Sequence, residues 1–145
     1  MATIFANAVS AIVLALQTPT PVAPLIERMR LRAIPDDVPT AVVVRISEAS
    51  VISHALAPNM PTGWRSALEV ECYARSSTAV PVDTAVDTLL QAVAERLMQD
   101  PTLGGTVLSL RPESLRYESD AAADDCMCAT LVFSTTQRPL GQFLT

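Results

Sequence analysis

Residues 64–75 read WRSALEVECYAR. Apolar or small residues at positions 68, 70, 72 and 74 alternate with Glu69, Glu71, Tyr73 and Arg75, which is the two-residue period of a strand. Such a strand buries one face and leaves the other to polar groups. The stretch therefore predicts a β-strand at the centre of the architecture, with a core on one side.

Two helices are predicted around this strand. Downstream, Pro81 and Asp83 open a helix with an apolar stripe, and Asp100-Pro101 and the Gly104-Gly105 pair end it. Upstream, residues 3–17 repeat apolar side chains at helical spacing until Pro19. The other side of that N-terminal helix is also apolar, and a neighbouring subunit could cover it.

Further strands are predicted on both sides of residues 64–75. Residues 28–33 alternate apolar and Arg side chains, residues 35–37 form a turn, and residues 41–46 should return antiparallel to make a hairpin with an Arg-rich face. Residues 106–110 and 115–118 are short strand-like pieces separated by Pro112. Residues 128–136, CATLVFSTT, close the fold as a central or near-central strand.

Residues 47–63 show neither the helical nor the strand period and contain Pro58, Pro61 and Gly63. We interpret them as a long loop, which in a compact domain is usually functional or disordered. The resulting fold class is α+β, a single-layer sandwich in which two main helices pack on a mostly antiparallel sheet. The 145 residues are expected to form one domain, 1–145.

Composition and charge limit where the protein can be located and which partners it can bind. A net charge of −5 disfavours specific binding to nucleic acid. Three cysteines, two of them one residue apart, suit neither a disulfide framework nor paired zinc ligands and favour a reduced cytoplasmic chain. The apolar run 8–16 has the length of a signal-peptide core but lacks basic residues before it, and it is too short to span a bilayer. We expect no membrane association.

No catalytic constellation is recognisable. The single histidine, His54, has no nucleophile or metal ligand at a suitable spacing, and no phosphate-binding glycine motif occurs. The carboxylate pairs Glu69 with Glu71 and Asp124 with Asp125 are interpreted as solvated surface groups. The sequence thus predicts a protein that is not an enzyme and has no cofactor, no catalytic residue and no metal site.

A surface for protein contacts is the alternative to a catalytic site. Arginines on one predicted hairpin face require partners, either carboxylates such as Glu69 and Glu71 on the same face or groups of another subunit, and both readings stay open. The long loop and the start of the following strand could add to that surface. The candidate interface residues are Arg28, Arg30, Arg32, Arg45, His54 and Trp64.

Several segments taken together resemble the tail terminator proteins of long-tailed phages, the U-like minor tail proteins. They are AVVVRISEAS, the Pro/Gly loop, WRSALEVECYAR, DTAVDTLLQAVAERLMQDPTLGG, LRPESLRYESD and CATLVFSTT. The resemblance covers about residues 28–136, and its most specific stretches end in VECYAR and in RLMQDPTLGG. It is a pattern of segments and contains no single diagnostic motif.

The resemblance implies a structural virion protein at the head-proximal end of the tail, assembled in the host cytoplasm. Its partners would be copies of itself in a ring, generally a hexamer, then the tail tube protein and a head-tail connector or neck protein. DNA could pass through such a ring without being specifically bound. A head-tail connector or neck protein is the alternative function, because such subunits share small size, α+β composition and ring assembly.

Overall fold

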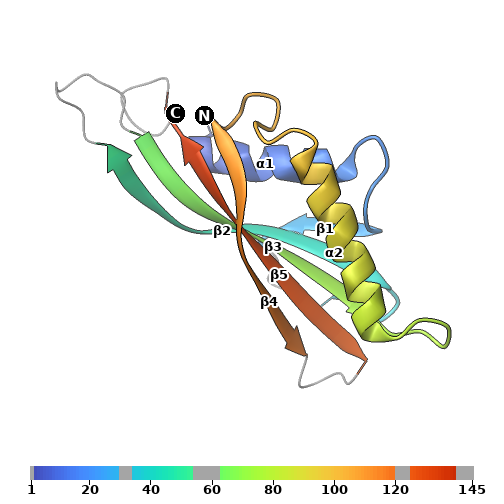
Figure 1. The fold of residues 1–145 in the computed structure, drawn as a ribbon. Helices are drawn as coiled ribbons and strands as arrows, with labels where there is room; N and C mark the ends of the chain where they lie inside the picture. The colour runs from blue at the N-terminus through green and yellow to red at the C-terminus, as the bar shows by residue number, and fades with distance from the viewer. Residues whose placement is uncertain (1, 30–33, 54–62, 120–124, 140–145) are drawn as a thin grey trace.

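The computed structural model describes residues 2–29, 34–53, 63–119 and 125–139. Two helices and five strands follow one another along the chain (Figure 1). Their bounds are α1 Ile4–Gln17, β1 Leu25–Arg28, β2 Thr40–Ser53, β3 Gly63–Arg75, α2 Val82–Met98, β4 Ser109–Ser119 and β5 Cys126–Gln137.

The strands form one sheet in the order β1-β2-β3-β5-β4. Every neighbouring pair is antiparallel except β1 with β2, which is parallel. Both helices lie on the same side of this sheet, α1 against β1 and β2 and α2 against β3 and β5 (Figure 1). The α+β class, with one mostly antiparallel sheet under two helices, is confirmed.

One apolar core fills the space between the helices and the sheet. Side chains of the inner strands that alternate toward the helices are fully buried at the centre of the sheet, among them Val70 on β3 and Phe133 on β5. The α2 stripe buries its side chains against them, namely Val86, Leu89, Leu90, Val93 and Leu97. At roughly 1.5–3 kcal/mol for each fully buried large aliphatic side chain, this layer is the main stabilising contribution.

Polar contacts fix α1 over the sheet. The Thr3 hydroxyl caps its first turn by accepting from the Ala6 amide at 3.2 Å. At its far end, the Arg96 guanidinium of α2 donates to the carbonyl oxygens of Ala15 and Thr18. The Gln137 side chain of β5 donates to the Ile4 carbonyl oxygen at 2.7 Å. Contacts from α2 and β5 therefore hold both ends of α1.

The predicted hairpin of residues 28–33 and 41–46 is wrong. The strand is β1, four residues long, and it pairs in parallel with residues 41–44 of β2. It ends at Arg28 because Met29 has a positive φ of 42°, which an extended strand does not allow. Residues 41–44 of β2 pair with β1 on one side and with β3 on the other, which leaves no place for the predicted antiparallel partner. Residues 30–33 of that predicted strand lie outside the described residues.

Two boundaries also differ from the sequence prediction. β2 continues to Ser53, so residues 47–53 of the predicted loop are strand, while residues 54–62 lie outside the described residues. The pieces predicted at 106–110 and 115–118 are not separate strands: one strand runs from Ser109 to Ser119, and residues 106–108 precede it. In both strands the register shifts, between Ile46 and Glu48 and between Pro112 and Ser114, and such bulges interrupt the two-residue period.

Candidate functional site

The sheet face opposite the helices is not covered by any described helix, and we call it the open face. Strand alternation places on it Arg45 of β2, Glu69 and Glu71 of β3, Thr130 of β5 and Arg116 of β4. The same register turns their sequence neighbours to the helix side, where Val44, Val70 and Leu131 are buried in the core. The open face is thus a polar surface on a sheet whose other face is apolar.

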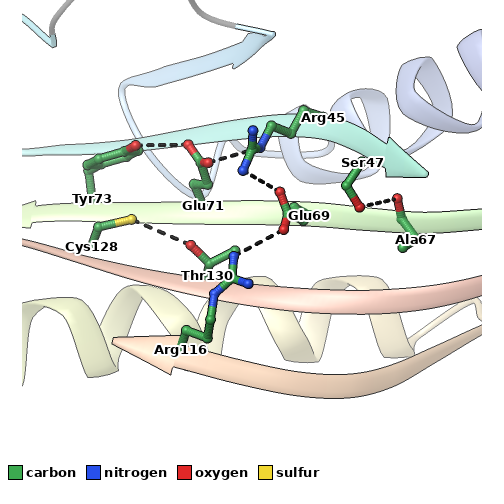
Figure 2. A network of polar contacts seen from close by, with 9 residues as sticks. All are labelled: Arg45, Ser47, Ala67, Glu69, Glu71, Tyr73, Arg116, Cys128 and Thr130. Carbon is green, nitrogen blue, oxygen red and sulfur yellow. Dashed lines mark hydrogen bonds and ion pairs between the residues drawn. The ribbon is translucent and has the colours of Figure 1, made fainter. Parts of the chain in front are cut away.

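A charged cluster occupies the middle of the open face, made of Arg45, Glu69, Glu71 and Arg116 (Figure 2). The Glu69 carboxylate has a cation on each side: Arg116 Nη2 donates a hydrogen bond to Oε1 at 3.0 Å, and Arg45 Nη2 forms an ion pair with Oε2 at 2.5 Å. Arg45 Nε also lies 3.1 Å from Glu71 Oε1. The cluster joins three of the five strands through their side chains.

Burial within the cluster is unequal. The Glu69 side chain is only 7% exposed, whereas those of Arg45 and Arg116 are 44% and 52% exposed. A carboxylate removed from water needs charged partners to compensate its lost hydration, and the two arginines supply them. Because they are half in water themselves, they reach over Glu69 and leave part of each guanidinium open to further contacts.

Neutral groups extend the network toward β5. The Tyr73 hydroxyl donates to Glu71 Oε2 at 2.8 Å, and Cys128 Sγ lies 3.7 Å from Thr130 Oγ1 (Figure 2). Partial burial, then the hydrogen bond to Glu71, raise the pKa of Tyr73 above its usual range. Burial likewise raises the pKa of the Cys128 thiol. Neither group is held in the ionised form that a nucleophile or general base needs.

The three cysteines are reduced and buried. Cys72 faces the core while Cys128 lies on the open face, so neighbouring strands keep them on opposite sides of the sheet. Burial raises the pKa of the Cys72 thiol to about 12. It packs as a small apolar side chain.

The predicted interface residues do not form one surface. Arg28 pairs with Val44 in the parallel register and faces the helices, where its guanidinium donates to Ser10 Oγ at 2.8 Å. Arg45 faces the opposite side of the sheet, so the prediction that Arg28 and Arg45 share one Arg-rich face is wrong. Trp64 lies on the helix side, edge-on to the Phe5 ring at 5.6 Å. Arg30, Arg32 and His54 lie outside the described residues.

Within the chain, Arg45 pairs with carboxylates of its own sheet, Glu69 and Glu71, as the first of the two alternatives expects. A contact of Arg45 with another subunit stays a prediction. The interpretation of Glu69 as a solvated group is wrong, because Arg45 and Arg116 cover it. Sequence reasoning missed Arg116, although the alternation Leu115, Arg116, Tyr117 marks it as an outward residue of a strand. The strand order, which brings β4 within reach of Glu69, could not be predicted from the sequence.

The described residues offer neither a metal site nor a membrane-spanning helix. In those residues no three or more His, Cys, Asp or Glu side chains are grouped so that they could hold a metal ion. Over the same part of the chain, neither helix has the length and apolarity needed to cross a bilayer. Both findings apply to residues 2–29, 34–53, 63–119 and 125–139 alone.

Comparison with known proteins finds the same fold elsewhere. No protein-family model matches the chain, and no curated protein matches it. One similar solved chain belongs to a structure described as the virion of a native gene transfer agent (GTA) particle, with a TM-score of 0.50 and 12% identity over 94% of this chain and 92% of that one. A second solved chain matches with a TM-score of 0.50 and 14% identity over 94% of each chain. At these identities the likeness establishes a shared fold.

Proposed function

We propose that the chain is a structural virion protein of a phage-like particle, and within it a tail terminator. One observation carries this proposal: the fold is similar, over nearly the whole length of both chains, to a chain in the virion of a gene transfer agent particle. The terminator role adds the segment resemblance over residues 28–136. On this proposal the chain performs no chemistry and acts through the surfaces it presents.

The sheet edges and the exposed apolar side chains of the described residues are consistent with a subunit that assembles with other copies. Among the described strands, β1 and β4 are the edges of the sheet, and the outer side of β4 presents backbone groups that no described strand pairs with. Apolar Leu115 and Tyr117 of β4 are 40% and 53% exposed beside that edge. Head-to-tail contacts between such surfaces form a closed ring when the rotation that relates neighbouring subunits adds up to a full turn. The family resemblance favours six copies.

In this proposal the ring binds the end of the tail tube, stops its growth and offers a surface to the connector or neck. Many modest contacts around a ring suffice, because each contact after the first is made at high effective concentration. Partners are therefore further copies of the chain, the tube protein and the head-proximal neck. The location is the head-proximal end of the tail.

Deleting the gene from the particle-producing strain tests the proposal. We expect filled heads together with unjoined tails that are often abnormally long, seen by electron microscopy of lysates. Adding the purified protein before overgrowth should restore joining. Free tails of normal length beside heads that lack a neck ring would contradict the terminator role and assign the chain to a connector or neck instead.

A further inference from the structure

A second feature of the open face lies away from the charged cluster, toward the start of β3 and of β4. It is a surface hollow of about 340 Å³ lined by Arg65, Ser109, Arg111, Glu113, Ser134 and Thr136. All six side chains are polar. We call it the Arg65–Arg111 hollow.

Sheet register builds the hollow from three strands. Thr136 of β5 lies between Arg65 of β3 and Ser109 of β4, and Ser134 pairs with Arg111 one row further along. The bulge between Pro112 and Ser114 leaves Glu113 outside the pairing, at the rim. Strand pairing therefore fixes the relative positions of the backbones that carry these side chains.

The two guanidinium groups differ from those of the charged cluster. Arg45 and Arg116 share Glu69, whereas in the part of the chain that the structure describes neither Arg65 nor Arg111 makes an ion pair or a side-chain hydrogen bond. Both are exposed. Two unpaired cations with hydroxyl groups between them are suited to an oxyanion, which a guanidinium binds through two parallel hydrogen bonds.

Charge decides which oxyanion fits. The two arginines and Glu113 leave the hollow with one net positive charge, which matches a single carboxylate. A nucleic acid would bring a row of phosphates against a protein of net charge −5, and that balance opposes its binding. A carboxylate side chain brings one charge and a planar geometry that matches the guanidinium.

We propose that the Arg65–Arg111 hollow binds a carboxylate side chain of another protein subunit. That the neighbour is a virion subunit rests on the proposed function, whereas the carboxylate chemistry rests on the hollow alone. Arg65 and Arg111 hold the carboxylate oxygens, and the hydroxyls of Ser109, Ser134 and Thr136 donate around them. The contact is exposed to solvent, so it weakens as salt is added.

Binding of synthetic peptides to the purified protein tests the site without requiring assembly. The probes are a fluorescent peptide of alternating Glu and Ser and its counterpart with Gln in place of Glu, followed by fluorescence anisotropy. We expect the Glu peptide to bind more tightly and the Arg65→Gln/Arg111→Gln double variant to lose at least about tenfold in affinity, since each charge-assisted hydrogen bond is strong. Arg138→Gln, an exposed arginine outside the hollow, is the matched control and should bind as the unaltered protein does.

Two results would overturn the site. One is equal binding of the Glu peptide by the double variant, with circular dichroism showing that the variant is folded. The other is tighter, Arg65- and Arg111-dependent binding of a short single-stranded oligonucleotide, which would identify a phosphate site. If the double variant does not fold, the single variants are measured, and each must still lose affinity for the Glu peptide. If the purified protein binds the Glu peptide but deletion of its gene leaves the tails normal, the terminator role is contradicted and the carboxylate site is supported.

Discussion

Glu69 shows how the environment of one residue can differ from what its position in a strand suggests. It occupies an outward position, yet its side chain is almost completely buried because Arg45 and Arg116 reach across it from β2 and β4. Sequence alternation predicted the direction of the side chain correctly. It could not predict burial, because the covering groups come from strands that are distant in sequence.

Replacing the two arginines by methionine tests this arrangement. We expect Arg45→Met and Arg116→Met each to lower the free energy of unfolding by about 1–2 kcal/mol, a value reduced by the exposure of both guanidiniums. The double variant should cost more than the two single changes together, by about 1 kcal/mol, because it leaves a buried carboxylate with no cation beside it. Urea denaturation of the four proteins measures this coupling.

Arg65→Met is the control for that cycle, since Arg65 lies on the same face without an ion pair. Its effect on the free energy of unfolding should stay within about 0.5 kcal/mol. Strictly additive effects of the two cluster substitutions would mean that the two arginines act independently of each other and do not share the compensation of Glu69.

Among the elements, those with an uninterrupted period were predictable. The alternation of residues 64–75 and the helical stripes of α1 and α2 each place enough apolar side chains on one face to fix the element and its orientation. β1 was not predictable, because residues 28–33 alternate as a strand would, while the positive φ of Met29 ends the strand at Arg28. Local period carries no information about such a turn or about the parallel pairing that precedes it.

Bulges limited the prediction of β2 and β4. At the shift between Ile46 and Glu48 the inward and outward positions exchange, so residues 47–53 no longer look like a continuation of the strand before them. Pro112 suggested a break in β4, but β4 is an edge strand with a bulge, where proline is tolerated. The sequence could not show that Arg28 and Arg45 lie on opposite faces, because the side of the sheet that each arginine occupies depends on strand order and register.

The turn after α2 gives a pH-dependent prediction. The Asp100 carboxylate accepts from the Thr102 hydroxyl at 2.7 Å, the Gly104 amide at 2.6 Å and the Thr102 amide at 3.1 Å. These bonds, the Thr102 hydroxyl first, lower the pKa of Asp100 below its usual value of 3.8. A lowered pKa in the folded state stabilises the protein above the unfolded value, and this contribution is lost as pH falls through the folded value.

We therefore expect Asp100→Asn to destabilise the fold at neutral pH, and the difference from the unaltered protein to shrink as pH falls below 3.8. Denaturation midpoints measured across that range check the trend. Asp87→Asn on the exposed side of α2, where the carboxylate accepts no hydrogen bond from the described residues, serves as the control. A difference that grew toward acid pH would contradict the proposed role of the carboxylate.

For the whole molecule, the sheet edges link the fold to the proposed assembly. β3 and β5 are paired on both sides, whereas β4 is paired on one side only. Alternate amides of an edge strand point away from the sheet and exchange with solvent readily unless another chain covers them. Assembly through this edge would change their exchange and leave the interior strands unaffected.

Hydrogen exchange of the free and assembled protein measures this difference. We expect the peptides that cover Ser109–Ser119 to exchange more slowly after assembly, whereas those of Gly63–Arg75 keep the same strong protection in both states. Assembled rings in which β4 exchanges as fast as in the free protein would exclude this edge from the subunit contact.

The bond between Gln137 and Ile4 has a consequence for biosynthesis. It joins the first helix to the end of the last strand, and β5 itself completes the middle of the sheet. During translation, α1 leaves the ribosome long before the residues that hold its first turn exist, at about 5–20 residues per second. The apolar helix must wait in a nascent chain, where a chaperone can shield it. Folding is completed only after the last strand has emerged.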